Sequence, residues 1–233
     1  MSLHMTTPEL RAAGTDLSER RRSGISRGPI SDIAPEPQRI GIASDASGTR
    51  IGALTTIAAL GADAGIVAGY PGLAAAACGL ATPQIRAIGT IGGNIAQRSR
   101  CWYFRNPHIG CLKKGGDSCP ARGGNHLYGV AFDLGPCVAP HPSTLAAALL
   151  AYEARIDTTL RRGLTVGDVL GNGSDGRRDH RLEPGEIIEA IHLPPPAAGE
   201  RAFYKRAISR AHAEWPLAEV CLRLVVVDGV VRL

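Results

Sequence analysis

The sequence is poor in aromatic residues, which make up 4% of its 233 positions, so alanine, valine, leucine and isoleucine must fill the core. It contains no apolar run approaching the ~18 residues that predict a membrane-spanning helix. Its N-terminus shows no basic segment followed by an apolar one, the pattern of an export signal. We therefore expect a cytoplasmic chain without a membrane span, exported only as the passenger of a partner subunit.

Cysteines and stacking aromatics are also too sparse for two classes of protein. Six cysteines in 233 residues do not resemble a small disulfide scaffold. The net charge is +5, and arginines cluster at residues 20–22 and 177–178. No aromatic residues alternate with these runs, as a platform for nucleic-acid bases would require. We expect no nucleic-acid binding and interpret the basic runs as solvated surface or a partner interface.

What the sequence does have is a glycine pair flanked by apolar residues, Gly92 and Gly93. Two adjacent residues without Cβ atoms allow backbone N–H groups to approach a ligand closely. Consecutive N–H groups in such a turn form a concavity that suits a phosphate. A weaker signal of the same kind is the run from Ala12 to Leu17, which predicts a strand end, a tight turn and a helix start. Thr15 or Asp16 would cap that helix, whose N-terminus favours phosphate; an ordinary helix cap is the alternative.

A polar loop follows the glycine pair and holds four of the six cysteines: Cys101, Cys111, Cys119 and Cys137. A loop of this length is unusual in a compact domain unless a cross-link or a bound group holds it in place. The four thiols could provide such a link. Zinc, joined by His108 or His126, is one alternative, although the cysteines are separated by nine, seven and seventeen residues rather than in close pairs. Two disulfides are another. We interpret Cys78 as a small buried apolar residue and Cys221 as a spectator.

Local patterns predict an alternation of helices and strands. Apolar spacing and small residues predict helices at residues 55–61, 69–80, 145–152 and 166–170, with Ser143 or Thr144 as the cap of the third. Alternation predicts strands at 30–33, 155–160, 186–193, 203–208 and 220–227, and a hairpin turn at 45–48. Three prolines at 194–196 predict a linker.

Several of these segments together resemble the FAD-binding subunit of the molybdenum hydroxylases, the xanthine dehydrogenase and aldehyde oxidoreductase family. The similarity extends to the bacterial type that carries an extra [4Fe-4S] cluster. The matching segments are residues 13–17, 81–86, 90–94, 100–104 and 141–143, together with the cysteine loop. The resemblance covers nearly the whole chain from about residue 11.

The resemblance implies an α+β fold: a two-part FAD-binding domain of the vanillyl-alcohol-oxidase-like type with an iron–sulfur insert. The expected parts are a shortened first FAD-binding subdomain at residues 6–40 and a second at 41–193, with the insert at 98–141. Residues 200–233 would begin a C-terminal α+β subdomain that is incomplete here. In such relatives a strand–helix unit precedes the first glycine-containing loop, and the chain continues beyond the position of Leu233.

The resemblance also implies the cofactor sites. The expected FAD-binding residues are Ala12, Ala13, Gly14, Thr15, Asp16, Leu17, Thr90, Ile91, Gly92, Gly93, Asn94, Thr144, Ile188 and Lys205. Thr144 stands where relatives commonly place an aspartate that contacts the flavin, so a charge is lost there. The four loop cysteines would bind the [4Fe-4S] cluster, and no catalytic acid or base is expected.

The implied function is electron relay. A molybdopterin-containing large subunit would oxidise an aldehyde or heteroaromatic substrate, and a small [2Fe-2S] subunit would pass the electrons on. This chain would collect them on FAD and reduce an external acceptor. The alternative is an interaction protein that is cofactor-poor or zinc-stabilised. The apolar strand at 222–227 is an exposed edge that predicts self-association or a covering partner.

Overall fold

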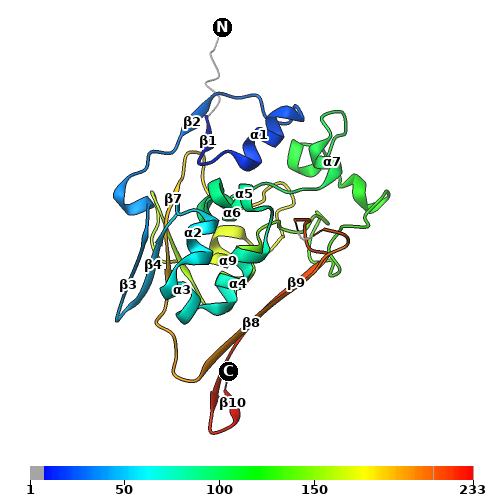
Figure 1. The fold of residues 1–233 in the computed structure, drawn as a ribbon. Coiled ribbons are helices and arrows are strands. Elements are labelled where there is room, and N and C mark those ends of the chain that lie inside the picture. Colours follow the sequence, from blue (N-terminus) through cyan, green and yellow to red (C-terminus); the bar gives the residue numbers. More distant parts are fainter. Residues whose placement is uncertain (1–7, 212, 233) are drawn as a thin grey trace.

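The computed structural model describes residues 8–211 and 213–232 (Figure 1). The chain forms three separate β-sheets, with most of the helices gathered around the largest one. Among the described residues, no helix combines the length and the apolar character that crossing a membrane requires. The expected domain bounds begin at Thr6 and end at Leu233, and residues 6, 7 and 233 lie outside the described part.

The N-terminal unit is a small crossover of strand, helix and strand. Strand β1 (Glu9–Arg11) pairs in parallel with β2 (Ile30–Asp32), and α1 (Thr15–Arg22) connects them. Parallel strands cannot be joined by a tight hairpin, so the helix supplies the return path. Arg11 Nη2 donates to Asp32 Oδ2 at 2.8 Å and joins the two strand ends. The predicted strand at 30–33 is confirmed, and the strand end predicted before the tight turn corresponds to β1.

The central sheet has the strand order β3-β4-β7-β5-β6, and every neighbouring pair is antiparallel. Its strands are β3 (Ile42–Asp45), β4 (Gly48–Gly52), β5 (Arg155–Thr158), β6 (Leu164–Thr165) and β7 (Ile188–Leu193). Ile51, Ile191 and Ile156 lie side by side in register, and all three are fully buried. The predicted hairpin is confirmed, because Asp45 pairs with Gly48 across the β3–β4 turn.

Short helices form the other half of the core: α2 (Ile57–Ala62), α3 (Ala64–Gly69), α4 (Pro71–Gly79), α8 (Thr144–Ala151) and α9 (Val166–Leu170). A further helix, α5 (Pro83–Ile88), contributes no buried residue. Alanines on α4 and α8 allow the backbones to pack closely, which suits a chain with few aromatics. Of the two predicted caps for α8, the structure uses Ser143, whose Oγ accepts from the Ala146 N–H at 3.1 Å. The prediction that Cys78 is buried is wrong: it is exposed at the end of α4, where its Sγ faces the Gly61 carbonyl.

The C-terminal strands form a sheet of their own, in the order β10-β9-β8, that runs along one side of the molecule (Figure 1). They are β8 (Glu200–Ala207), β9 (Ala218–Val227) and β10 (Val230–Arg232). Phe203 pairs with Leu222 on the outer face, where these side chains and Val220 are 56%, 46% and 53% exposed. The opposite face packs Ala202, Tyr204 and Cys221 against the core. Self-association through the outer face stays a prediction.

The cysteine segment follows α6 (Ile91–Ile95) and has little regular structure. It contains α7 (Trp102–Arg105) and two 3-10 turns, at Leu112–Lys114 and Pro120–Arg122, and a further 3-10 turn lies earlier in the chain at Pro37–Arg39. This agrees with the irregular loop expected from its glycine and proline content. In Figure 1 the segment lies beside α1.

One carboxylate, Asp16, joins the N-terminal unit to this segment. It accepts hydrogen bonds from Arg105 Nη2 at 2.7 Å, Arg20 Nε at 3.0 Å and the backbone N–H of Arg98 at 3.1 Å. Arg100 Nη1 lies 3.2 Å away. Burial alone would raise the pKa of Asp16, but the Arg105 hydrogen bond and the charges of Arg100 and Arg105 outweigh it and lower the pKa below its ordinary value. Asp16 is therefore ionised and contributes to stability.

We expect Asp16→Asn to lower the free energy of unfolding by about 2 kcal/mol at pH 7, because it leaves half-buried arginines without their counter-charge. Since the folded-state pKa of Asp16 lies below the unfolded value, its contribution is complete above about pH 4 and is lost as the pH falls through the folded pKa. Urea unfolding at several pH values measures both effects. Asp32→Asn, at an exposed pair, is the control and should cost far less. Equal losses for the two variants would contradict this role of Asp16.

Candidate functional site

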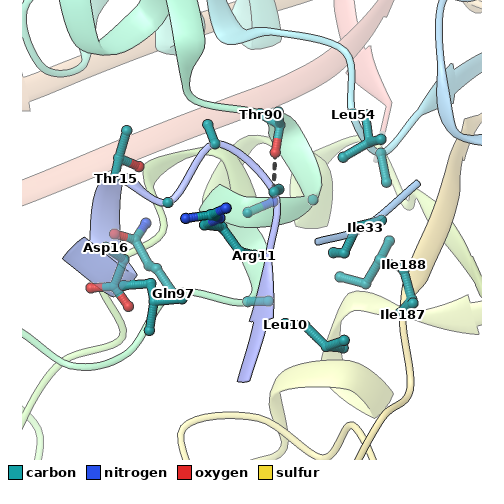
Figure 2. Close-up of a pocket in the computed structure, with 18 of the residues that line it drawn as sticks. Leu10, Arg11, Thr15, Asp16, Ile33, Leu54, Thr90, Gln97, Ile187 and Ile188 are labelled. Carbon is teal, nitrogen blue, oxygen red and sulfur yellow. Dashed lines mark hydrogen bonds between the residues drawn. The ribbon is translucent and has the colours of Figure 1, made fainter. Parts of the chain in front are cut away.

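A pocket of about 120 Å³ lies where the β1–α1 turn meets α6 and the start of β7 (Figure 2). Thr15, Asp16 and Gln97 gather at one end of it in Figure 2, and Leu54, Ile33 and Ile188 at the other. The pocket thus has a polar end and an apolar end. Its full lining is Leu10, Arg11, Ala12, Ala13, Gly14, Thr15, Asp16, Leu17, Arg20, Ile33, Ala53, Leu54, Thr90, Gly92, Gly93, Ala96, Gln97, Leu182, Glu186, Ile187 and Ile188.

The β1–α1 turn leaves backbone donors free in this pocket. Gly14 is the N-cap of α1 and has a φ of 76°, a left-handed conformation that glycine adopts without strain. The predicted cap by Thr15 or Asp16 is wrong: no side chain caps α1, because the Asp16 carboxylate is held by arginines. In the described structure, the N–H groups of Thr15, Asp16 and Leu17 donate to no protein acceptor. Free N–H groups at a helix N-terminus attract anions.

The glycine pair opposite is the first turn of helix α6 rather than the free turn that the sequence predicted. Thr90 caps α6, and its Oγ1 accepts from the Gly93 N–H at 3.1 Å (Figure 2). The Gly92 N–H donates to the Ala53 carbonyl at 2.9 Å. Both donors are therefore engaged within the protein, so the pair provides space rather than free N–H groups.

Each of the two glycines leaves space beside a different neighbour. A Cβ atom at Gly92 would lie 2.8 Å from the Ala53 Cβ, so this glycine permits α6 to pack against the chain after β4. A Cβ at Gly93 would lie 2.9 Å from Thr90 Oγ1 and 4.0 Å from the Ala12 Cβ across the pocket. Gly93 is exposed, and Gly92 is buried. A side chain at Gly93 would consequently displace the Thr90 cap and enter the pocket.

The structure brings most of the sequence-predicted cofactor residues together. Those that line the pocket are Ala12, Ala13, Gly14, Thr15, Asp16, Leu17, Thr90, Gly92, Gly93 and Ile188. Sequence reasoning missed the apolar end, formed by Leu10, Ile33, Leu54 and Ile187, because these residues belong to four segments that only the fold assembles. No local motif marks them.

Four predicted residues do not line the pocket. Ile91 is fully buried in the core. Asn94 uses its Oδ1 to accept a hydrogen bond from Ser143 Oγ at 2.7 Å, which links α6 to α8. Thr144 is buried in the first turn of α8, and Lys205 is exposed on β8. The last two thus lie on elements away from the β1–α1 turn.

A buried carboxylate borders the pocket but is committed to a partner. Burial alone would raise the pKa of Glu186, but hydrogen bonds from Arg161 and Thr158 lower it to about 2. Arg161 Nη2 contacts Glu186 Oε2 at 2.8 Å. This carboxylate is therefore ionised and paired at neutral pH, and it supports the wall rather than exchanging protons.

The four thiols of the cysteine loop are partly shielded from water: Cys111 is buried, and Cys101, Cys119 and Cys137 are half-buried. Burial raises the pKa of the Cys137 thiol, and the nearby Cys119 and Cys101 add to the rise. All six cysteines are free, and Cys111 is buried. Each of Cys101, Cys111 and Cys119 immediately precedes a short helical turn. However, no three His, Cys, Asp or Glu side chains in the described ranges lie close enough together to hold a metal ion. The four loop cysteines are thus suitable ligands for a metal centre, but in the described ranges their side chains are not gathered into a metal-binding group. His108 and His126 are exposed.

Comparison with solved structures identifies the fold. A Cu,Mo-CO dehydrogenase crystal structure matches with a TM-score of 0.69 at 21% identity, covering 97% of this chain and 64% of that one. A carbon monoxide dehydrogenase from Hydrogenophaga pseudoflava matches with a TM-score of 0.69 at 24% identity over the same shares. At these identities the likeness concerns the fold alone.

Sequence comparison is more specific. The Escherichia coli (strain K12) aldehyde oxidoreductase FAD-binding subunit PaoB is 33% identical over 184 residues, which cover 76% of this chain. The chain spans 58% of the length of that relative. Residues 11–196 match the family model described as the FAD binding domain in molybdopterin dehydrogenase. The chain therefore belongs to the family of FAD-binding domains of molybdopterin dehydrogenases.

Proposed function

We propose that this chain is an FAD-binding electron-transfer subunit of a molybdenum hydroxylase-type complex. The observation that carries the proposal is the row of free N–H groups at Thr15, Asp16 and Leu17 in the pocket of a domain from an FAD-binding family. A diphosphate is the part of FAD that such a helix N-terminus would favour. Bound FAD would supply the conversion between one-electron and two-electron transfer.

Different residues of the chain would contribute to different parts of the FAD site. Gly14 supplies the left-handed turn before the first three residues of α1, which line the pocket, and Gly93 keeps the opposite wall free of a side chain. Ile33, Leu54 and Ile188 give the apolar end a surface suited to a ring system. The outlying Thr144 and Lys205, with Ile91 and Asn94, would act only by supporting this wall or at a more distant part of the cofactor. The division into units at residues 6–40, 41–193 and 200–233 is part of the same proposal.

The partners are proposed from the relative. PaoB is by name the FAD-binding subunit of an aldehyde oxidoreductase. By analogy we propose a molybdopterin-containing large subunit and a [2Fe-2S] small subunit as electron donors to this chain, with an aldehyde or heteroaromatic substrate and an external electron acceptor. The exposed outer face of β8 and β9 is the surface available for such a subunit or for a second copy of the chain.

We expect Gly93→Val to weaken FAD binding about a hundredfold, because the branched side chain would displace Thr90 and fill pocket space. Flavin fluorescence titration measures the affinity. Gly110→Val is the matched control, since a Cβ there meets no atom within 4 Å and lies outside the pocket. Circular dichroism verifies that both variants fold. Undiminished affinity in a folded Gly93 variant would place FAD elsewhere.

We further propose that Cys101, Cys111, Cys119 and Cys137 bind one [4Fe-4S] cluster, each thiolate ligating one iron. Closing the loop between the first and last cysteine costs roughly 3 kcal/mol by the logarithmic rule. Structural metal–thiolate binding in small peptides releases ~10–16 kcal/mol, so ligation would draw the thiols together against that cost. Four cations close in sequence, Arg100, Lys113, Lys114 and Arg122, would offset the negative charge of the cluster.

Single Cys→Ser substitutions at all six cysteines test this assignment. Iron and sulfide content should fall sharply in the four loop variants of anaerobically prepared protein, because each removes one ligand. Cys78→Ser and Cys221→Ser are matched controls that should keep full iron content. Four irons retained in Cys119→Ser, or iron lost in Cys78→Ser, would refute the ligand set. Zinc in place of iron, or no flavin and no metal, would favour the alternative of a zinc-stabilised or cofactor-poor interaction protein.

A further inference from the structure

A second cavity, of about 530 Å³, lies between the N-terminal unit and the cysteine segment. The walls come from β1, α1 and the turn after α1 on one side, and from α7 and the 3-10 turn at Leu112–Lys114 on the other. The lining residues are Glu9, Arg20, Gly24, Ile25, Arg27, Arg98, Phe104, Pro107, Lys113 and Lys114. Its volume falls within the range of small-molecule sites, roughly 300–1,000 Å³.

The cavity wall holds five cationic side chains and a single carboxylate, Glu9. Glu9 already forms ion pairs with two cations: Arg20 Nη1 lies 2.9 Å from Glu9 Oε1, and Arg21 Nη1 lies 3.4 Å from Glu9 Oε2. Asp179, outside the lining, is likewise shared, by Arg98 and by Lys113 at 2.8 Å. The neighbouring carboxylates therefore do not balance the positive charge of the wall.

Two of the cations pair with no carboxylate in the part of the chain that the structure describes. Lys114 Nζ donates to the backbone carbonyls of Tyr103, at 2.9 Å, and Asn106. Arg27 Nε donates to the Gly24 carbonyl at 3.2 Å. The hydrogen bonds of both side chains in this part of the chain thus go to neutral carbonyl groups, and neither cation has a carboxylate as its counter-charge.

Phe104 gives this basic wall an apolar backing. Its ring is only 2% exposed, and the Arg98 guanidinium lies 5.0 Å from the ring centroid. Positive charges in a concave, partly apolar wall focus the electrostatic field and attract anions more strongly than the same charges on an open surface. Lysine and arginine side chains together suit the oxygens of a phosphate group.

We propose that this cavity binds a phosphate-bearing anion, either free phosphate or diphosphate or the phosphate groups of a nucleotide. The site is separate from the proposed flavin pocket, with which it shares only Arg20. Because its walls come from α1 on one side and the cysteine segment on the other, a bound anion would hold the two together.

Calorimetric titration of the full chain with pyrophosphate, in excess FAD and at low salt, tests the proposal. We expect one saturable site, weakened about tenfold in Arg27→Gln and in Lys114→Gln because each loses a charged donor. Arg22→Gln is the matched control: it removes an exposed arginine of α1 that does not line the cavity, and it should keep the parent affinity. FAD affinity should be unchanged in Arg27→Gln, since Arg27 lies outside the flavin pocket.

Parallel titrations with inorganic phosphate and ADP identify the source of the phosphate group. Tighter binding of ADP than of pyrophosphate would support a nucleotide, and equal binding would support the phosphate group alone. Absence of saturable binding would overturn the proposal. Equal weakening in Arg22→Gln would also overturn it, by revealing a general charge effect, as would displacement of FAD by pyrophosphate.

Discussion

The half-buried charge of Asp16 is the constraint on which the pocket depends. Helix α1 is strongly polar, and Leu17 is its only buried residue, so hydrophobic packing alone offers little to position it. Asp16 instead accepts hydrogen bonds from Arg105 and from the backbone of Arg98, 89 and 82 residues further along the chain. A carboxylate that is largely removed from water needs such partners, and these contacts hold α1 against the segment that follows α6. The first three residues of α1 then line the same pocket as Gly92 and Gly93 of α6.

Arg100 connects this group of charged side chains to the C-terminal part of the chain. The guanidinium of Arg100 lies 3.2 Å from Asp16 and 4.8 Å from the ring centroid of Trp215, in the connection between β8 and β9. Burial lowers the pKa of Arg100, while the charge of Asp16 opposes that change. One arginine thus contacts both the N-terminal unit and the connection between β8 and β9. The segment that leads into the cysteine loop is therefore a structural junction as well as the proposed cluster site.

The glycines of the site act through three separate physical effects. Gly14 supplies a left-handed backbone, Gly92 allows α6 to pack against Ala53, and Gly93 leaves the pocket wall bare. Only the first has free N–H donors beside it, because the N–H groups of the pair are already bonded to Ala53 and Thr90. The flavin and anion proposals accordingly depend on different groups: backbone donors in one cavity and charged side chains such as Arg27 in the other.

Local sequence patterns predicted the features that depend on neighbouring residues: the hairpin at Asp45–Gly48, a cap by Ser143 or Thr144 on α8, the strand at β7 and the glycine runs at the site. Only the folded chain shows that Ser143 is the cap, that Cys78 is exposed, and that Leu10 and Ile33 line the pocket while Thr144 and Lys205 do not. The physical reason is the separation along the chain of the residues that interact. Caps and turns are set by bonds across about three residues, whereas the pocket is closed by ion pairs and hydrogen bonds between residues some 80 positions apart, as from Arg98 to Asp16.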